Sequence, residues 1–273
     1  MGARSRRTAL LCISLMVAAG ASLAAAEPVA FRTWKTIAQG TLEEPNQKTA
    51  EVSTEDLRRI LADGSAVVFD ARPPKEYAIS HIPGALNVRG KPGLSMSQYV
   101  PDAAEIERAL GGKTGSPIVL YCSGPFCGRS KRLSEELLSI GFTNVRRYQL
   151  GIPVWRALGG ATQIEGEAVG YVHEMDRSAV FIDTRDQEEF QAGTLARAVS
   201  VPVRGLERGT VVAEVRRAKD DGRLPMEDHN TRVIVFGRDG TQARAVAEAI
   251  TEEAFHNVAF YDGTFASLRQ RVK

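Results

Sequence analysis

The chain of 273 residues is 43% hydrophobic and 25% charged, with a formal net charge of +2. This composition is typical of a globular protein and excludes a fibrous or largely disordered chain, and the length suffices for one large or two ordinary domains. The nearly balanced charge gives no support to a nucleic-acid or membrane-surface partner.

The first 26 residues have the pattern of a secretory signal peptide. Arginines within the first seven residues precede an apolar run at 9–19, and alanines at 24–26 offer a small-residue cleavage site. The apolar run is too short to span a membrane, so we expect no stable membrane insertion once residues 1–26 are removed. Their removal would take away three arginines and no acid, leaving a net charge of about −1. The mature protein is therefore expected in the periplasm or outside the cell.

Residues 27–50 show no sustained periodicity and are interpreted as an N-terminal extension that packs on the domain that follows. Ser53 has the character of a helix cap ahead of an apolar helix face, and a buried strand at 66–69 comes next. Beyond it, short apolar strands alternate with segments of helical spacing. Helices are predicted at 105–110, 130–140, 206–218 and 241–252, and strands at 118–121, 145–148, 180–182, 233–236 and 258–261.

A segment at 70–88 returns in altered form at 183–201, and each copy follows an apolar strand. Two copies at domain-sized spacing indicate a tandem duplication rather than a solenoid. We therefore predict an α/β protein with two tandem domains, each a mostly parallel sheet flanked by helices. The predicted boundaries are 51–160 for the first domain, 161–167 for a linker and 168–273 for the second domain.

The stretch 117–132 joins an apolar strand to a helix through a loop of small residues, with Cys122 at the end of the strand. A cysteine in such a place is, by itself, more often a small buried apolar residue than a nucleophile. Here Gly124 and Gly128 permit the positive φ values that turn backbone amides inward, and three cations follow Gly128. Because it faces a helix start, the thiol is expected to have a lowered pKa and to react as a thiolate with an anionic substrate.

These features resemble the rhodanese family of sulfurtransferases, here as a tandem pair of rhodanese-like domains. The resemblance is carried by Asp70-Ala71-Arg72, Glu76-Tyr77, residues 81–85, the Tyr121-Cys122 strand end with its loop, and residues 148–155. It implies that Cys122 accepts sulfur from a small anionic donor such as thiosulfate and passes the persulfide sulfur to cyanide or to a protein thiol. The loop residues expected to cradle the persulfide are Ser123, Gly124, Pro125, Phe126, Gly128, Arg129 and Ser130. No cofactor is implied, and no metal-ligand spacing is present.

Cys127 lies in the same loop and is the only other cysteine that remains after signal removal. In an oxidising compartment two such thiols either pair or are used chemically. One hypothesis makes Cys127 a resolving thiol that attacks the Cys122 persulfide, releases sulfide and leaves a disulfide. The alternative is a second loop residue that faces the core. Comparison of the two copies predicts that the loop of the first domain is two residues longer than that of the second. Arg129 also follows Cys122 at a greater sequence distance than the loop arginine does in common rhodaneses. Both differences leave the set of substrates open.

The second domain is predicted to be inactive because Gly237 stands where the first domain has Cys122. Its expected role is structural, and Arg238 is a candidate for reaching the Cys122 site. Charged residues of the first copy persist in this copy, so they are interpreted as a structural ion-pair and capping network. They are Asp70, Arg72 and Glu76, matched by Asp183, Arg185 and Glu189. His81 is replaced by Thr194 and is a candidate for supporting the site, with a purely structural histidine as the alternative.

Two other functions stay open at this point. The protein could be a thiol-disulfide redox or sensing protein that uses Cys122 and Cys127 as a pair, or a rhodanese-like binding module without catalysis. A phosphatase fits less well, because related cysteine phosphatases place an arginine six positions after the cysteine and Gly128 occupies that position here.

Overall fold

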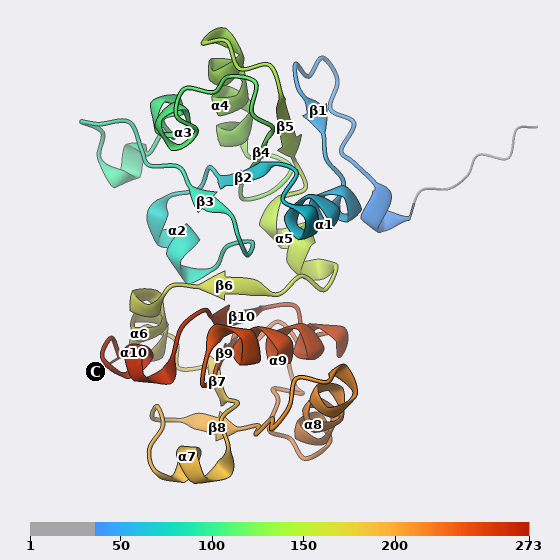
Figure 1. The fold of residues 1–273 in the computed structure, drawn as a ribbon, viewed down its shortest axis with the longest axis vertical. Coiled ribbons are helices and arrows are strands. Elements are labelled where there is room, and N and C mark those ends of the chain that lie inside the picture. Colours follow the sequence, from blue (N-terminus) through green and yellow to red (C-terminus); the bar gives the residue numbers. More distant parts are fainter. Residues whose placement is uncertain (1–35, 273) are drawn as a thin grey trace, which may run out of the picture. The chain divides into compact units, whose positions relative to one another are not determined.

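The two predicted domains each contain a five-stranded sheet in which every strand pair is parallel (Figure 1). The computed structural model describes residues 36–272, so the predicted signal peptide and the start of the extension lie outside the described residues. Within that described part, no helix has the length and apolar character needed to cross a membrane.

The first sheet has the order β1-β5-β4-β2-β3, which puts β4 at its centre. Its strands are β1 (Ala50–Glu51), β2 (Val67–Asp70), β3 (Leu86–Asn87), β4 (Ile118–Tyr121) and β5 (Val145–Tyr148). The helical segments are η1 (Ile37–Gln39), α1 (Thr54–Asp63), α2 (Pro74–Ile79), η2 (Met96–Gln98), α3 (Ala103–Ala109), α4 (Gly128–Ser139) and α5 (Gly151–Ala157). The predicted helix cap is confirmed, because the Asp56 amide donates to Ser53 Oγ at 3.1 Å while the Asp56 carboxylate accepts from the Ser53 amide.

Side chains of β4 point alternately to the two faces of the first sheet. Val119 and Tyr121 join the apolar cluster that contains residues of α1 and α5, whereas Ile118 and Leu120 join the cluster that contains residues of α3 and α4. All four side chains are fully buried, as expected for a central parallel strand covered on both faces. This packing holds the end of β4, and therefore Cys122, in a fixed position within the first domain.

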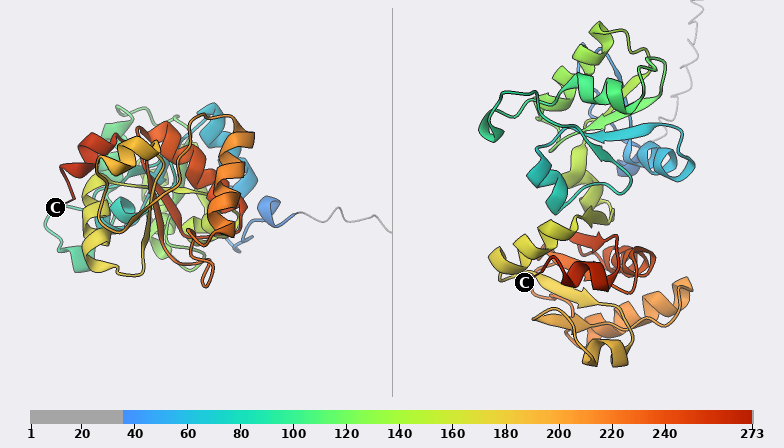
Figure 2. Two further views of the ribbon diagram at one scale, coloured as in Figure 1. Left: turned by 90° about the horizontal axis from the view of Figure 1, so that it is seen from below. Right: turned by 60° about the vertical axis from the view of Figure 1, so that its left-hand side comes forward.

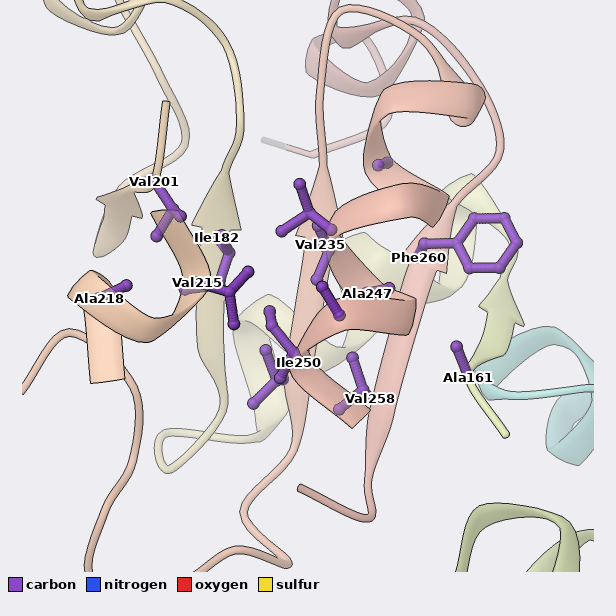
Figure 3. Close-up of a cluster of buried hydrophobic side chains, with 14 of the residues drawn as sticks. Ala161, Ile182, Val201, Val215, Ala218, Val235, Ala247, Ile250, Val258 and Phe260 are labelled. Carbon is purple, nitrogen blue, oxygen red and sulfur yellow. The ribbon is translucent and has the colours of Figure 1, made fainter. Parts of the chain in front are cut away.

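The second sheet repeats this arrangement, with the order β6-β10-β9-β7-β8 and β9 at its centre (Figure 1). Figure 2 shows the same fold from two further sides. Its strands are β6 (Thr162–Ile164), β7 (Val180–Asp183), β8 (Ala198–Ser200), β9 (Val233–Phe236) and β10 (Val258–Tyr261). Its helices are α6 (Gly166–Met175), α7 (Gln187–Gln191), α8 (Arg208–Asp220), α9 (Gly240–Glu252) and α10 (Phe265–Arg269). On one face, Val215 of α8 and Ile250 of α9 belong to the same cluster as Ile182 and Val235 of the strands (Figure 3).

The predicted linker at 161–167 is not a separate segment in the structure. Residues 162–164 form β6, which pairs with β10 at the edge of the second sheet, and α6 begins at Gly166. The edge strands β1, β3 and β8 were also not predicted. Strands of two or three residues carry too few positions for an apolar alternation to stand out in the sequence.

The described part of the N-terminal extension packs on the first domain, as predicted. Glu44 accepts from Lys131 Nζ at 2.7 Å and from Arg147 Nη1 at 3.3 Å, and Gln47 accepts from Gln149 at 2.8 Å. The pKa of Glu44 is lowered, chiefly by the hydrogen bond from Lys131. The extension therefore supplies a carboxylate to the first turn of α4.

Candidate active site

Cys122 directly follows the central strand of the first sheet, at the edge where the carboxyl ends of parallel strands meet. The residue is only 2% exposed, and its carbonyl accepts from the Ile152 amide at 3.3 Å. Gly151 lies against the same backbone with φ of +67°, and a Cβ there would be 2.6 Å from both the Cys122 oxygen and the Gly124 nitrogen. Only glycine fits this position, so α5 begins in direct contact with the Cys122 loop.

A disulfide joins Cys122 to Cys127, the N-cap residue of α4, with a Cα–Cα distance of 6.2 Å. Between the two cysteines the chain turns, and the Cys127 amide donates to the Gly124 carbonyl at 3.0 Å. Gly124 has the predicted positive φ, +138°. Gly128 does not, because it is the first residue of α4, so the prediction of a left-handed conformation there was wrong.

The other predicted cradle residues differ in exposure. Ser130 is buried, Phe126 is fully exposed at 100%, Gly124, Pro125 and Arg129 are half-buried, and Ser123 and Gly128 are exposed. Ser123 Oγ donates to Glu76 Oε2 at 3.3 Å, and the Arg129 guanidinium lies 6.0 Å from the centre of the Tyr99 ring. The sequence did not predict the contact between Tyr99 and Arg129, because the segment around Tyr99 has neither helical nor strand periodicity.

The cations that follow the loop are not equivalent. Lys131 is paired with Glu44, whereas Arg132 is exposed and Arg129 faces Tyr99. A helix N-terminus and nearby guanidinium groups both favour an anion. The reduced loop would therefore have an electrostatic surrounding suited to a thiolate, a persulfide or an anionic sulfur donor.

Asp70 and Arg72 form a buried structural pair behind the site, as predicted. Asp70 accepts from the Arg72 backbone amide at 2.9 Å and from Tyr121 Oη at 2.7 Å. Burial, and then the negative charge of Asp70, raises the pKa of Tyr121, so the phenol remains a hydrogen-bond donor. Because Asp183 and Arg185 pair in the same way in the second domain, this network does not depend on a cysteine.

The side chain of Glu76, in α2, contacts the Cys122 loop rather than this network, so its predicted place in the ion-pair network was wrong. Its contact is with Ser123, and the matching residue of the second domain, Glu189, pairs with Arg238 at 2.9 Å. Arg238 also pairs with Asp186 at 2.9 Å. The idea that Arg238 reaches the Cys122 site is therefore wrong, because its guanidinium is held by carboxylates of its own domain.

The second domain has no room for a cysteine and an anion at the matching position. A Cβ on Gly237 would be 2.3 Å from Thr184 Oγ1 and 2.7 Å from Gln242 Oε1. Gln242 Oε1 also accepts the Arg238 amide at 2.9 Å, so a side chain already uses the loop N–H. Three residues separate β9 from α9, against six between β4 and α4, so the first loop is longer by three residues rather than the predicted two.

His81 is buried and stacks on Tyr77, with ring centroids 3.8 Å apart. Its Nδ1 lies 2.9 Å from the Tyr77 carbonyl oxygen, and its backbone pairs with Gln163 of β6. Burial lowers the pKa of His81 to about 4, against a smaller opposite effect of the Tyr77 carbonyl. These contacts describe a structural histidine. Its connection to the site runs through the next residue, whose amide donates to Tyr121 Oη.

The pKa of His81 predicts a pH dependence of stability. As pH falls below 6.5, His81 binds a proton in the unfolded chain, whereas in the folded chain it stays neutral down to about pH 4. The free energy of unfolding therefore decreases as the pH falls from 6.5 to about 4. At about pH 5 the loss relative to neutral pH should be about 2 kcal/mol. Urea unfolding of the wild-type protein and of His81→Gln, at about pH 5 and at neutral pH, measures this loss of free energy. An equal loss in both proteins would contradict this assignment.

Together, the fold and the site define a tandem α/β protein whose first domain places a cysteine between its central strand and a helix N-terminus. A sequence model of the rhodanese-like domain matches residues 53–158 and 170–270, which include four of the five strands of each sheet. The chain therefore belongs to the rhodanese family and contains two rhodanese-like domains.

Similar proteins include named sulfurtransferases. The thiosulfate:glutathione sulfurtransferase of Saccharomyces cerevisiae is 31% identical over 116 residues, which cover 40% of this chain and 78% of the yeast protein. Among solved structures, a thiosulfate sulfurtransferase from Pseudomonas aeruginosa is 19% identical with a TM-score of 0.35, covering 81% of this chain and 42% of that one. A 3-mercaptopyruvate sulfotransferase from Escherichia coli is 21% identical with a TM-score of 0.34, and the match covers 79% of this chain and 98% of that one. The family and the yeast relative support sulfur transfer as the general chemistry of this chain.

No group of three or more His, Cys, Asp or Glu side chains that could hold a metal ion is found within residues 36–272. Cys122 is instead bonded to a second cysteine, its neighbour Ser123 donates to Glu76, and Arg129 lies in the first turn of α4. This set suits the chemistry of sulfur nucleophiles.

Proposed function

We propose that this protein is a sulfurtransferase that accepts a sulfane sulfur on Cys122 from a small anionic donor such as thiosulfate, and passes it to cyanide or to a thiol. The observation that carries the proposal is the position of Cys122, buried at the end of the central strand under a loop that leads into α4. The second domain, in which Gln242 and Thr184 fill the matching position, serves a structural role.

Sulfur uptake begins with the reduced pair. The Cys122 thiolate attacks the outer sulfur of thiosulfate, the bond between the two donor sulfurs breaks, and sulfite leaves with the electron pair. The product is a Cys122 persulfide anion. The N-terminus of α4 and the guanidinium of Arg129 are the groups that would stabilise this charge.

Two reactions can remove the sulfur. An acceptor thiolate can attack the outer persulfide sulfur, which forms a new persulfide on the acceptor and regenerates the Cys122 thiolate. Alternatively, the Cys127 thiol can attack the inner sulfur, which forms the Cys122–Cys127 disulfide and releases hydrosulfide. The disulfide in the structure supports the second route, because it is the product that this route would leave.

We also propose that the protein works in an oxidising compartment, the periplasm or the cell exterior. The cysteine pair supports this location, because a disulfide between two loop residues persists where thiols are not kept reduced. The signal-like pattern of residues 1–26 points to the same compartment.

Intact-mass measurements after brief exposure of the reduced protein to thiosulfate test the proposal. One added sulfur, about 32 Da, should depend on Cys122 and should accumulate in Cys127→Ser, because the resolving thiol is then absent. Cys122→Ser is the control and should gain no sulfur. Loss of about two hydrogens in wild type without any sulfur gain in Cys127→Ser would favour a thiol-disulfide redox protein instead.

A further inference from the structure

The two sulfur-bearing residues of the disulfide differ in their access to solvent. Cys122 is 2% exposed, and its backbone is enclosed by the Gly151 and Ile152 contacts at the start of α5. Cys127 is partly exposed and lies between Phe126 and Gly128, both of which are exposed. An external reagent that reaches this disulfide therefore meets the Cys127 side first.

Thiol-disulfide exchange depends on which sulfur is attacked and on access to it. The attacking thiolate approaches one sulfur from the side opposite to the sulfur that leaves. Attack on Cys122 would need access to a side chain that is 2% exposed, on a backbone held against Gly151 and Ile152. Attack on Cys127 needs an approach only from the surface of the loop.

We propose that Cys127 is the attachment site for an external thiol, a role that rests on the proposed function and adds the step that returns the oxidised pair to a sulfur-accepting state. The external thiolate forms a bond to Cys127 Sγ, and the Cys122–Cys127 bond breaks. The electron pair of the broken bond leaves with Cys122 as a thiolate. No further oxidant or reductant takes part in this step.

The direction of attack has a functional consequence. The thiolate released first is that of Cys122, the sulfur-accepting residue, while Cys127 is blocked by the mixed disulfide and cannot close the ring again. A second thiolate then removes the first from Cys127 as a small disulfide. Attack in the opposite direction would block Cys122 and prevent sulfur uptake.

Regioselective trapping tests this proposal with the native oxidised protein. The protein is exposed briefly to glutathione, free thiols are blocked with iodoacetamide, and a tryptic digest is sequenced by mass spectrometry. Both cysteines fall in one peptide, residues 114–129, so the two adducts are compared within the same molecule. Glutathione on Cys127 and carbamidomethyl on Cys122 should exceed the reverse pattern by at least about tenfold.

The same reaction in concentrated urea is the control, and the preference should largely disappear because the fold no longer shields Cys122. Glutathione mainly on Cys122, an even split in the native protein, or no adduct on either cysteine would overturn the proposal. No thiosulfate is present, so a failure here is separate from a failure of sulfur uptake, which is read from the added mass on Cys122 in Cys127→Ser.

Discussion

Replacement of Cys122 with serine is expected to lower sulfur transfer from thiosulfate to cyanide by at least about a thousandfold, because a hydroxyl cannot carry the persulfide. The rate of thiocyanate formation measures the effect. Since Cys122 is a small buried residue in a loop, the serine protein should keep its fold, which circular dichroism can verify. A variant that retains most of the wild-type rate would exclude Cys122 as the sulfur carrier.

A cysteine added to the second domain provides a matched comparison. Gly237→Cys in the Cys122→Ser background should not restore transfer, because the new side chain would meet Thr184 and Gln242 at less than van der Waals distance. The loop there also lacks the three additional residues, and its Arg238 amide is bonded to Gln242. Restored activity would show that a strand-end cysteine suffices without the longer loop.

Gly151→Ala is expected to damage both the site and the domain. The new Cβ would lie 2.6 Å from the Cys122 oxygen and the Gly124 nitrogen, which are backbone atoms that cannot move aside without shifting the loop. We expect a loss of about 2–4 kcal/mol in the free energy of unfolding, from the positive φ together with the displaced loop. We also expect about a hundredfold loss of sulfur transfer in the protein that remains folded, because the nucleophile is misplaced.

Gly64→Ala is the control for the backbone conformation alone. Gly64 has φ of +65°, close to that of Gly151, but its Cβ would meet no atom within 4 Å. This substitution should cost only about 1 kcal/mol and leave the rate of sulfur transfer unchanged. Equal effects of the two substitutions on activity would show that contact between Gly151 and the Cys122 loop is unimportant.

The sequence by itself determined the main features of this protein. Four-residue apolar runs such as 118–121 and 233–236 predicted the central strands, because a strand buried on both faces must be apolar throughout. The repeated segment at 70–88 and 183–201 predicted two domains, since a buried acid and an arginine two residues apart remain recognisable where the cysteine has been lost. The strand end, the glycine-containing loop and the helix start singled out Cys122, and the family resemblance implied its role as the sulfur carrier.

Other features depended on tertiary structure because they arise between segments that are distant in sequence. The edge strand β6 exists only through its pairing with β10, and its three residues give no periodic signal. The steric need for Gly151 depends on the backbone of Cys122, and the lack of space for a side chain at Gly237 depends on Thr184 and Gln242. The positive charge of Arg238 suited an anion-binding site at Cys122, but Asp186 and Glu189 of its own domain pair with it. Residue types can be read along the chain, whereas the space around a side chain and the partner of a charge are decided by packing.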